Sequence, residues 1–162
     1  MKHSKNFPRF YVLVGEKTNW EVSLNTNIWG FIERSRGLWN TIEINEFIAF
    51  YVTKPIQKIM GFGQITRKFI DEEILWSDEK FFKRAIWKYR INFKPIYVIN
   101  DWNEGIMVPK NLILRSSRIV VESDLFFDFV KKTDEKWKTN ILKEIQNEVK
   151  KLKPTKNSYE NK

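Results

Sequence analysis

Aromatic side chains are the residues of this chain whose chemistry is most informative. The sequence contains seven Trp and thirteen Phe, more than the core of a chain this size requires, so some rings are expected to line a surface or a pocket. Trp29, Trp39 and Trp76 lie outside the predicted strand cores. Trp29 precedes a glycine in an expected turn, and Trp76 comes just before an expected helix cap. A flat indole wall suits a nucleobase, because each stacked base contributes about 1–3 kcal/mol.

Polar groups near these rings are candidates for recognising the edge and the phosphates of a base. The Asn19 side chain can both donate to and accept from a base edge, and Gly30 would let a backbone group approach closely. Five basic residues are candidates for positioning contacts with flanking phosphates: Lys17, Arg34, Arg36, Lys54 and Arg67.

A structural interpretation competes with this one. A tryptophan in a small domain is more often part of the core than of a ligand site. An asparagine near a helix start more often serves the helix, and an arginine loop is most often a solvated surface. The residue pattern alone therefore supports a basic domain with a nucleic-acid partner as one interpretation.

The charge balance favours a polyanionic partner. The 162 residues include 29 Lys and Arg against 20 Asp and Glu, a formal net charge of +9. Each phosphate that a basic side chain neutralises releases counterions, which favours nucleic-acid binding. A high charge also serves solubility, and that alternative stays open.

The composition excludes several kinds of site. There is no Cys, and the single His is His3. Disulfides, thiolate metal sites, cysteine nucleophiles, histidine triads and multi-histidine metal sites are therefore excluded. An acidic run, Asp71, Glu72 and Glu73, raises the alternative of a magnesium-dependent nuclease, but sequence neighbours seldom converge on one ion. We expect no enzyme activity, no catalytic residue, no metal and no cofactor.

No apolar run is long enough to cross a bilayer, and the basic first eight residues are not followed by an apolar signal region. The expectation is a cytoplasmic protein without a membrane partner. Hydrophobic residues make up 42% of the chain, enough for a core. One domain over residues 8–153 is expected, followed by a disordered polar tail over 154–162.

Strands are predicted where β-branched and aromatic residues form continuous runs. Gly61 and Gly63 within one run indicate a bulge or a close backbone approach, and Pro95 within another marks an edge or a bulge. A polar loop is expected over 33–37. The predicted strands are 10–14, 47–53, 59–69, 89–98 and, within a partly extended segment 111–122, 119–121.

Helices are predicted from capping signals and from apolar spacing. Thr18 and Glu21 form a capping box that would start a helix over 19–24, and Ser77 is a good N-cap for a helix to about residue 85. A short helix is expected over 124–132. Another would begin after Thr133, with a core stripe at Trp137, Ile141, Ile145 and Val149. The mixture of strands and short helices favours an α+β, barrel-like domain over a doubly wound sheet.

An ordered set of short segments resembles the EVE domain family, which belongs to the PUA-like superfamily and is related to the YTH domains that read methylated adenine in RNA. The resemblance covers about residues 8–100 and is weaker over 101–150. It implies a PUA-like mixed β-barrel surrounded by short helices, with a C-terminal helical segment. The segments are Trp20-Glu21-Val22, Ile28-Trp29-Gly30, Asn40-Thr41-Ile42, Phe50 to Pro55, Ile59-Met60-Gly61 and Tyr89-Arg90-Ile91.

The resemblance also implies a site that takes one flipped, modified base. Trp29 matches a tryptophan of the base-binding cage, Trp76 falls where a second wall is expected, and Asn19 matches a polar position after the first strand. The candidate base pocket comprises Asn19, Trp20, Trp29, Gly30, Trp39 and Trp76.

The chain departs from the family pattern at three places. Asn45-Glu46 replaces a Pro-Gly turn, the stretch Trp87 to Arg90 lacks the family's proline, and an Arg-Trp element of the C-terminal half is not evident. The segment 100–132 is therefore expected to be rebuilt, with an effect on one wall of the pocket.

The predicted function is non-enzymatic binding of DNA or RNA through a modified base, such as a methylated one, in an aromatic pocket. The alternative is a PUA-like domain that binds structured RNA by its backbone and shape, with the tryptophans mostly in the core. The sequence does not distinguish DNA from RNA, name the modification or give the oligomeric state.

Overall fold

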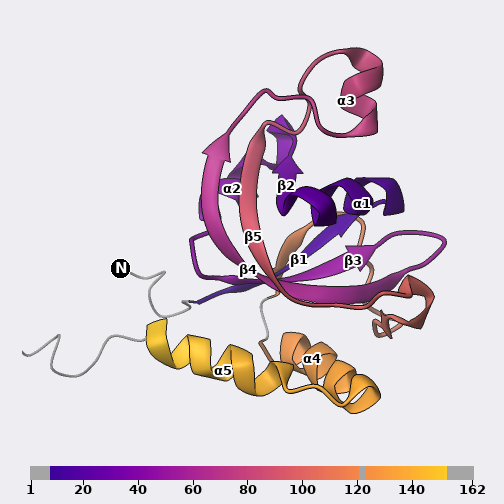
Figure 1. Cartoon of the computed structure of the whole chain (residues 1–162), viewed down its shortest axis with the longest axis vertical. Coiled ribbons are helices and arrows are strands. Elements are labelled where there is room, and N and C mark those ends of the chain that lie inside the picture. Colours follow the sequence, from indigo (N-terminus) through magenta and orange to yellow (C-terminus); the bar gives the residue numbers. More distant parts are fainter. Residues whose placement is uncertain (1–7, 121–122, 153–162) are drawn as a thin grey trace, which may run out of the picture.

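The computed structural model describes residues 8–120 and 123–152. A curled, seven-stranded mixed sheet forms the centre of the fold (Figure 1), with strand order β2-β5-β4-β3-β1-β7 and β6 paired to β4 outside this path. The strands are β1 (Phe10–Gly15), β2 (Ile28–Phe31), β3 (Phe47–Val52), β4 (Lys58–Ile70), β5 (Tyr89–Val98), β6 (Ile106–Met107) and β7 (Arg118–Val120). The helices are α1 (Lys17–Thr26), η2 (Glu33–Ser35), α2 (Arg36–Thr41), α3 (Ser77–Phe82), η3 (Trp102–Glu104), α4 (Ser123–Trp137) and α5 (Ile141–Leu152).

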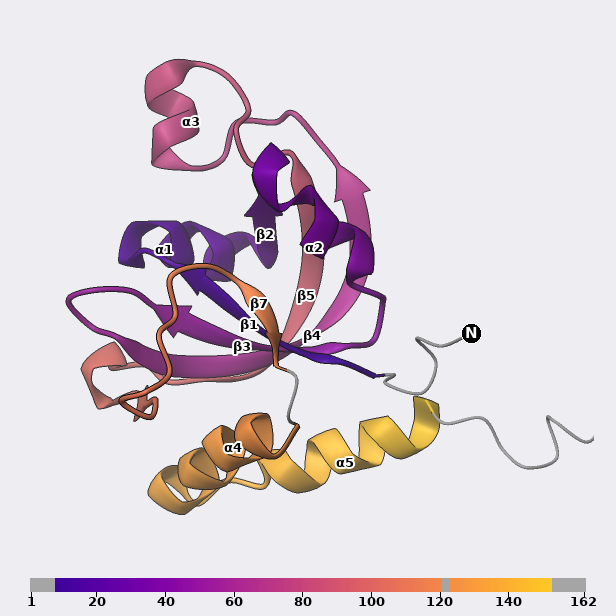
Figure 2. The same ribbon diagram turned by 180° about the vertical axis from the view of Figure 1, so that it is seen from behind.

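The sheet is antiparallel except at its centre, where β1 and β3 run parallel from the pair Phe10↔Phe47 to Gly15↔Val52. Both strands are continuous apolar runs, as is typical of strands that are covered on both faces. Helix α1 lies on one side of them, and α4 with α5 lies on the other (Figures 1 and 2). The polypeptide crosses from β1 to β3 through α1, β2 and α2.

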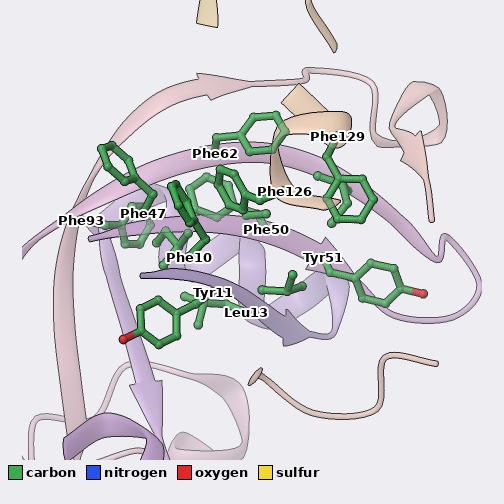
Figure 3. Packing of buried hydrophobic residues seen from close by; sticks show 14 of the residues in the cluster. Phe10, Tyr11, Leu13, Phe47, Phe50, Tyr51, Phe62, Phe93, Phe126 and Phe129 are labelled. Carbon is green, nitrogen blue, oxygen red and sulfur yellow. The ribbon is translucent and has the colours of Figure 1, made fainter. Parts of the chain in front are cut away.

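Phenylalanine rings from the sheet and from α4 pack together in the core (Figure 3). Phe126 of α4 packs with its ring centroid 4.8 Å from that of Phe10 and 5.6 Å from that of Phe62. Phe129 and Val130 of the same helix are fully buried. Aromatic pairs at such distances contribute about 0.5–1.5 kcal/mol beyond the burial of their surface.

Strand β4 bends where its two glycines meet neighbouring groups. A Cβ atom at Gly61 would lie 2.6 Å from the Tyr97 carbonyl oxygen, and one at Gly63 would lie 3.0 Å from the Phe50 ring. The register with β5 shifts between Phe62 and Gly63, opposite Pro95 and Tyr97. Both the predicted close approach at the glycines and the predicted bulge at Pro95 are confirmed.

The N-terminal local predictions need correction. Helix α1 begins at Lys17 with Glu16 at its N-cap, and no capping-box hydrogen bond between Thr18 and Glu21 forms. Trp29 lies within strand β2 rather than in a turn, because Ile28–Phe31 pairs with β5. The segment 33–37 is not a loop: it contains η2 and the start of α2. Helix α3 begins at Ser77 with Trp76 as N-cap and ends at Phe82, because Lys83 is left-handed (φ 59°).

The C-terminal helices also divide differently from the prediction. Helix α4 continues through Thr133 to Trp137, and Lys138 then turns the chain with a positive φ of 58°. The Asp134 carboxylate accepts hydrogen bonds from the backbone amides of Ile141 (2.8 Å) and Leu142 (3.0 Å), which starts α5. The predicted stripe is therefore split, with Trp137 on α4 and Ile141 on α5, and Trp137 is only partly buried.

The fold class is the predicted one: a mixed, curled half-barrel sheet with several short helices and a C-terminal helical segment. The predicted tail over 154–162 lies outside the described residues. No helix among the described residues is long and apolar enough to span a membrane.

Candidate nucleic-acid interface

A cavity of about 410 Å³ opens where the end of β1, the start of α1, strand β2 and the start of α3 meet. This volume falls within the range of about 300–1,000 Å³ that is typical of small-ligand sites. Three tryptophans border it together with glycines and polar side chains. The lining residues are Val14, Gly15, Glu16, Asn19, Trp29, Gly30, Thr53, Trp76, Ser77, Asp78, Trp87 and Arg115.

Trp29 forms one wall of this tryptophan cavity and is fixed from behind. Trp20 stacks on it with ring centroids 4.1 Å apart and an interplanar angle of 24°. The edge of the Trp29 ring lies over Gly15, where an added Cβ would come within 2.3 Å of Trp29 Cη2. Glycine is thus required at position 15 by the close approach of the ring.

Trp76 and Trp87 also line the cavity and lie close to Gly30. A Cβ atom at Gly30 would lie 2.5 Å from Trp87 Cβ and 3.0 Å from Trp76 Cη2. Trp76 donates from Nε1 to the Asn19 carbonyl oxygen and to Ser23 Oγ, both at 3.3 Å. These contacts hold the Trp76 ring between α1 and β2.

Two of the three tryptophans that line the cavity, Trp29 and Trp76, are buried, and Trp87 is partly buried. Trp29 exposes 5% of its surface and Trp76 exposes 2%. The rings therefore do not leave the interior, and the cavity instead extends inward to them. These fractions include the ring surface that faces the cavity, so only a small part of each indole is accessible to a ligand there.

Glu79 holds the two backbone segments that carry Trp76 and Trp87. Its Oε1 accepts hydrogen bonds from the backbone amides of Leu75 (2.9 Å) and Trp76 (3.3 Å). Its Oε2 accepts from the backbone amides of Ile86 (2.8 Å) and Trp87 (2.9 Å). Burial acts to raise the pKa of Glu79, but these four amides outweigh it and hold the pKa below its usual value.

Arg90 completes this buried cluster behind Trp76. Its guanidinium carbon lies 5.2 Å from the Trp76 ring centroid, and Nη2 lies 3.4 Å from Glu79 Oε2. Arg90 Nη1 lies 3.6 Å from Asp71 Oδ2, and Nη2 donates to the Glu73 carbonyl oxygen. Two members of the acidic run thus hold Arg90, and no group of three or more acidic, His or Cys residues able to hold a metal occurs in the described part of the chain.

Polar side chains around the cavity supply both donors and acceptors. The Asp78 carboxylate accepts from Trp87 Nε1 (2.9 Å to Oδ2) and from the Glu79 backbone amide (2.8 Å), and it retains acceptor capacity. The Asn19 side chain makes no hydrogen bond within the described residues. Thr53 and Ser77 add hydroxyl groups to the lining.

Four of the six residues predicted for the base pocket line the cavity together: Asn19, Trp29, Gly30 and Trp76. Trp20 lies one layer deeper, fully buried, with its Nε1 donating to the Tyr51 carbonyl oxygen at 2.9 Å. Trp39 lies elsewhere, on α2. Its Nε1 donates to the Arg90 carbonyl oxygen at 2.9 Å, and Lys68 Nζ lies 4.7 Å from its ring.

The predicted phosphate contacts divide into two groups. Lys17 follows the lining residue Glu16, and Lys54 follows the lining residue Thr53, so both exposed side chains start beside the cavity. Arg34, Arg36 and Arg67 are exposed on η2, α2 and β4, which supply no residue to the lining.

Two of those arginines contact other side chains. Arg36 pairs with Glu33 at 3.7 Å, and the Arg67 guanidinium lies 4.2 Å from the Phe69 ring centroid.

Sequence reasoning missed three lining residues that the proposed site uses: Asp78, Trp87 and Arg115. Trp87 comes just before a predicted strand, as Trp76 comes just before a predicted helix. This position at the start of an element could have indicated Trp87 as a candidate for the pocket. Arg115 lies between β6 and β7, in the segment expected to change one wall of the pocket. Ser117 nearby ties this segment to β1 by accepting from the Val14 amide at 2.9 Å.

Comparison with solved structures identifies the fold. The chain is similar to the YTH domain-containing protein mmi1 in its RNA complex, with a TM-score of 0.51, 15% identity and coverage of 76% of this chain and 79% of that chain. It is also similar to the YTH domain of Zygosaccharomyces rouxii MRB1 protein in complex with N6-methyladenosine RNA, with a TM-score of 0.50, 12% identity and coverage of 78% and 86%. The fold is YTH-like.

No family model and no curated protein matches the chain. A structure of protein PSPTO5229 from Pseudomonas syringae aligns with a TM-score of 0.35 and 17% identity over 54% of this chain and 69% of that chain, too low to bear on the fold. Membership of the EVE family and of the PUA-like superfamily stays a prediction, whereas the YTH-like α+β fold is shown.

Proposed function

We propose that this YTH-like domain binds nucleic acid by taking one modified nucleobase into the tryptophan cavity, without catalysing a reaction. The observation that carries the proposal is the convergence of Trp29, Trp76 and Trp87 on a single base-sized space. Indole faces and edges supply dispersion and stacking to a planar heterocycle. The same walls would bury a methyl group, which gains about 0.8 kcal/mol per carbon removed from water.

Polar groups of the lining would set the orientation of the base. The Asn19 amide can pair with a donor and an acceptor on a base edge, as Asn does with adenine. The Asp78 carboxylate, held by Trp87 and its own helix, is an acceptor for an amino group of the base. Because a flipped base costs a few kcal/mol to unstack, both wall contacts and edge hydrogen bonds are needed.

Basic side chains at the mouth would hold the phosphates next to the flipped nucleotide. Arg115 belongs to the lining itself, and Lys17 and Lys54 adjoin it. The formal charge of +9 would add a sequence-independent attraction to any nucleic acid.

The structural neighbours support this proposal. Two YTH domains of similar fold were solved with RNA, one of them with N6-methyladenosine RNA. These observations favour a base reader over a domain that recognises only the backbone and shape of structured RNA.

The experiment compares affinities for one oligonucleotide with and without methylated adenine or cytosine, at fixed salt, using Asn19→Ala and Asn25→Ala. Both asparagines lie on α1, but only Asn19 lines the cavity. We expect Asn19→Ala to reduce the preference for the modified base about tenfold, the cost of one or two hydrogen bonds, while Asn25→Ala keeps it. Equal wild-type binding of every modified and unmodified oligonucleotide would overturn the proposal.

A further inference from the structure

Helix α3 presents two exposed phenylalanines one turn beyond its cavity-lining residues Ser77 and Asp78. Phe81 exposes 77% of its surface and Phe82 exposes 56%, and their rings meet edge to face with centroids 5.0 Å apart. The helix projects from the body of the sheet in both views (Figures 1 and 2). Large apolar side chains this exposed on a projecting element are typical of interaction sites.

The helix geometry places this pair on the same face as the cavity lining. Phe81 follows Ser77 by four residues, and Phe82 follows Asp78 by four residues, so each ring lies one turn above a lining residue. Four residues of helix correspond to a rise of about 6 Å. A group that contacts the phenylalanines would therefore be a near neighbour of whatever occupies the cavity.

The surroundings of the pair are basic. Lys80, Lys83 and Arg84 are exposed around it, and the Arg84 guanidinium lies 5.9 Å from the Phe82 ring centroid. Interleaved aromatic and cationic side chains are the arrangement with which proteins hold single-stranded nucleic acid, the rings against bases and the cations against phosphates. The charge therefore favours a nucleic-acid strand over an apolar peptide as the occupant.

We propose that Phe81 and Phe82 are a stacking platform for the nucleobase adjacent to the one in the tryptophan cavity. This inference rests on the proposed function and assigns a second base subsite to α3. The strand would then bridge from the cavity across one turn of α3, with its phosphates next to Lys80 and Lys83. The platform tolerates any base, because every base has an apolar face.

The test is a double-mutant cycle between protein and oligonucleotide. Phe81→Ala and the wild type are titrated with an oligonucleotide carrying the preferred modified base, with either an intact neighbouring base or an abasic site on each side in turn. We expect Phe81→Ala to weaken binding of the intact strand about 5- to 30-fold. It should have little effect on the strand whose abasic site removes the stacking partner. Ile44→Ala, an exposed apolar residue that does not line the cavity, is the control.

Three results would overturn the platform. One is an unchanged affinity of Phe81→Ala for the intact strand. Another is an equal loss for intact and abasic strands. The third is concentration-dependent dimerisation of the wild type that Phe81→Ala abolishes, which would assign the pair to a second copy of the chain. If instead the wild type binds modified and unmodified oligonucleotides equally while the Phe81 cycle shows coupling, the proposed function fails and the stacking surface stands.

Discussion

Glu79 and Arg90 form a fully buried ion pair behind the tryptophan cavity, with 3.4 Å between Glu79 Oε2 and Arg90 Nη2. The carboxylate also holds the backbone amides of Trp76 and Trp87. A single side chain thus positions two indole walls that lie eleven residues apart in sequence. Because the pair is buried, removing one partner would leave an uncompensated charge next to the site.

Replacing Glu79 should therefore damage the whole α3 segment. We expect Glu79→Gln to lower the free energy of unfolding by about 3–5 kcal/mol, the usual cost of breaking a buried ion pair. Chemical denaturation followed by tryptophan fluorescence measures the change. Glu144→Gln, at an exposed position of α5, is the matched control and should stay within about 0.5 kcal/mol of the wild type. A loss below 1 kcal/mol for Glu79→Gln would contradict the role assigned to this carboxylate.

The same carboxylate predicts a pH dependence. The pKa of Glu79 is lowered in the folded state, so the charged form is the one that the fold stabilises. Its contribution is fully present above about pH 4.3, the pKa of an unfolded-state glutamate, and is lost as the pH falls through the lowered value. The difference in unfolding free energy between the wild type and Glu79→Gln should stay constant from pH 7 to 5 and shrink below pH 4. A difference that grows on acidification would have the wrong sign for this account.

Gly15 and Gly37 offer a matched pair of substitutions. A methyl group at Gly15 would lie 2.3 Å from Trp29 Cη2, whereas one at Gly37 meets nothing within 4 Å. Gly15→Ala should displace the Trp29 wall, destabilise the domain by about 1–3 kcal/mol and weaken binding of the modified oligonucleotide. Gly37→Ala, within α2, should leave binding unchanged and stabilise the fold by up to about 1 kcal/mol. Thermal melts and binding isotherms of the two variants, run together, check this contrast.

Strands and cavity walls differ in how far the sequence predicts them. The strands β1, β3, β4 and β5 were predicted within one or two residues, because continuous β-branched and aromatic runs reflect burial on both faces. The end of α4 was not, because Lys138 reverses the chain within an uninterrupted apolar stripe. The helix start that follows depends on the Asp134 carboxylate, which is a contact through space.

The tryptophans show the same limit at the site. Trp29 in β2 and Trp76 before α3 meet at the cavity. Trp39, next to a similar polar stretch, is instead bonded to the Arg90 carbonyl of β5. No local pattern separates these cases. Arg115 reaches the cavity because the segment before β7 returns to β1. This pairing joins residues far apart in the chain, so the residues next to Arg115 in the sequence do not indicate it.

Arg115 and Arg34 distinguish a phosphate contact at the cavity from general basicity. Arg115→Ala should weaken binding and reduce the slope of log affinity against log salt concentration by about 1, the signature of one lost phosphate contact. Arg34→Ala removes the same charge from η2, away from the lining, and should change the slope little. Binding titrations of the two variants at salt concentrations from about 50 to 300 mM give the two slopes. An equal effect of both would indicate binding through overall charge.

The central claim, that a base enters the tryptophan cavity, is tested most directly by nuclear magnetic resonance of the seven indole N–H groups. Titration with an oligonucleotide carrying one modified base should shift the Nε1–H signals of Trp29, Trp76 and Trp87 strongly and leave those of Trp39, Trp102 and Trp137 nearly unchanged. The unmodified oligonucleotide should shift the same three signals only at higher concentration. If binding instead leaves these three signals in place while the others move, no base occupies the cavity and the account is wrong.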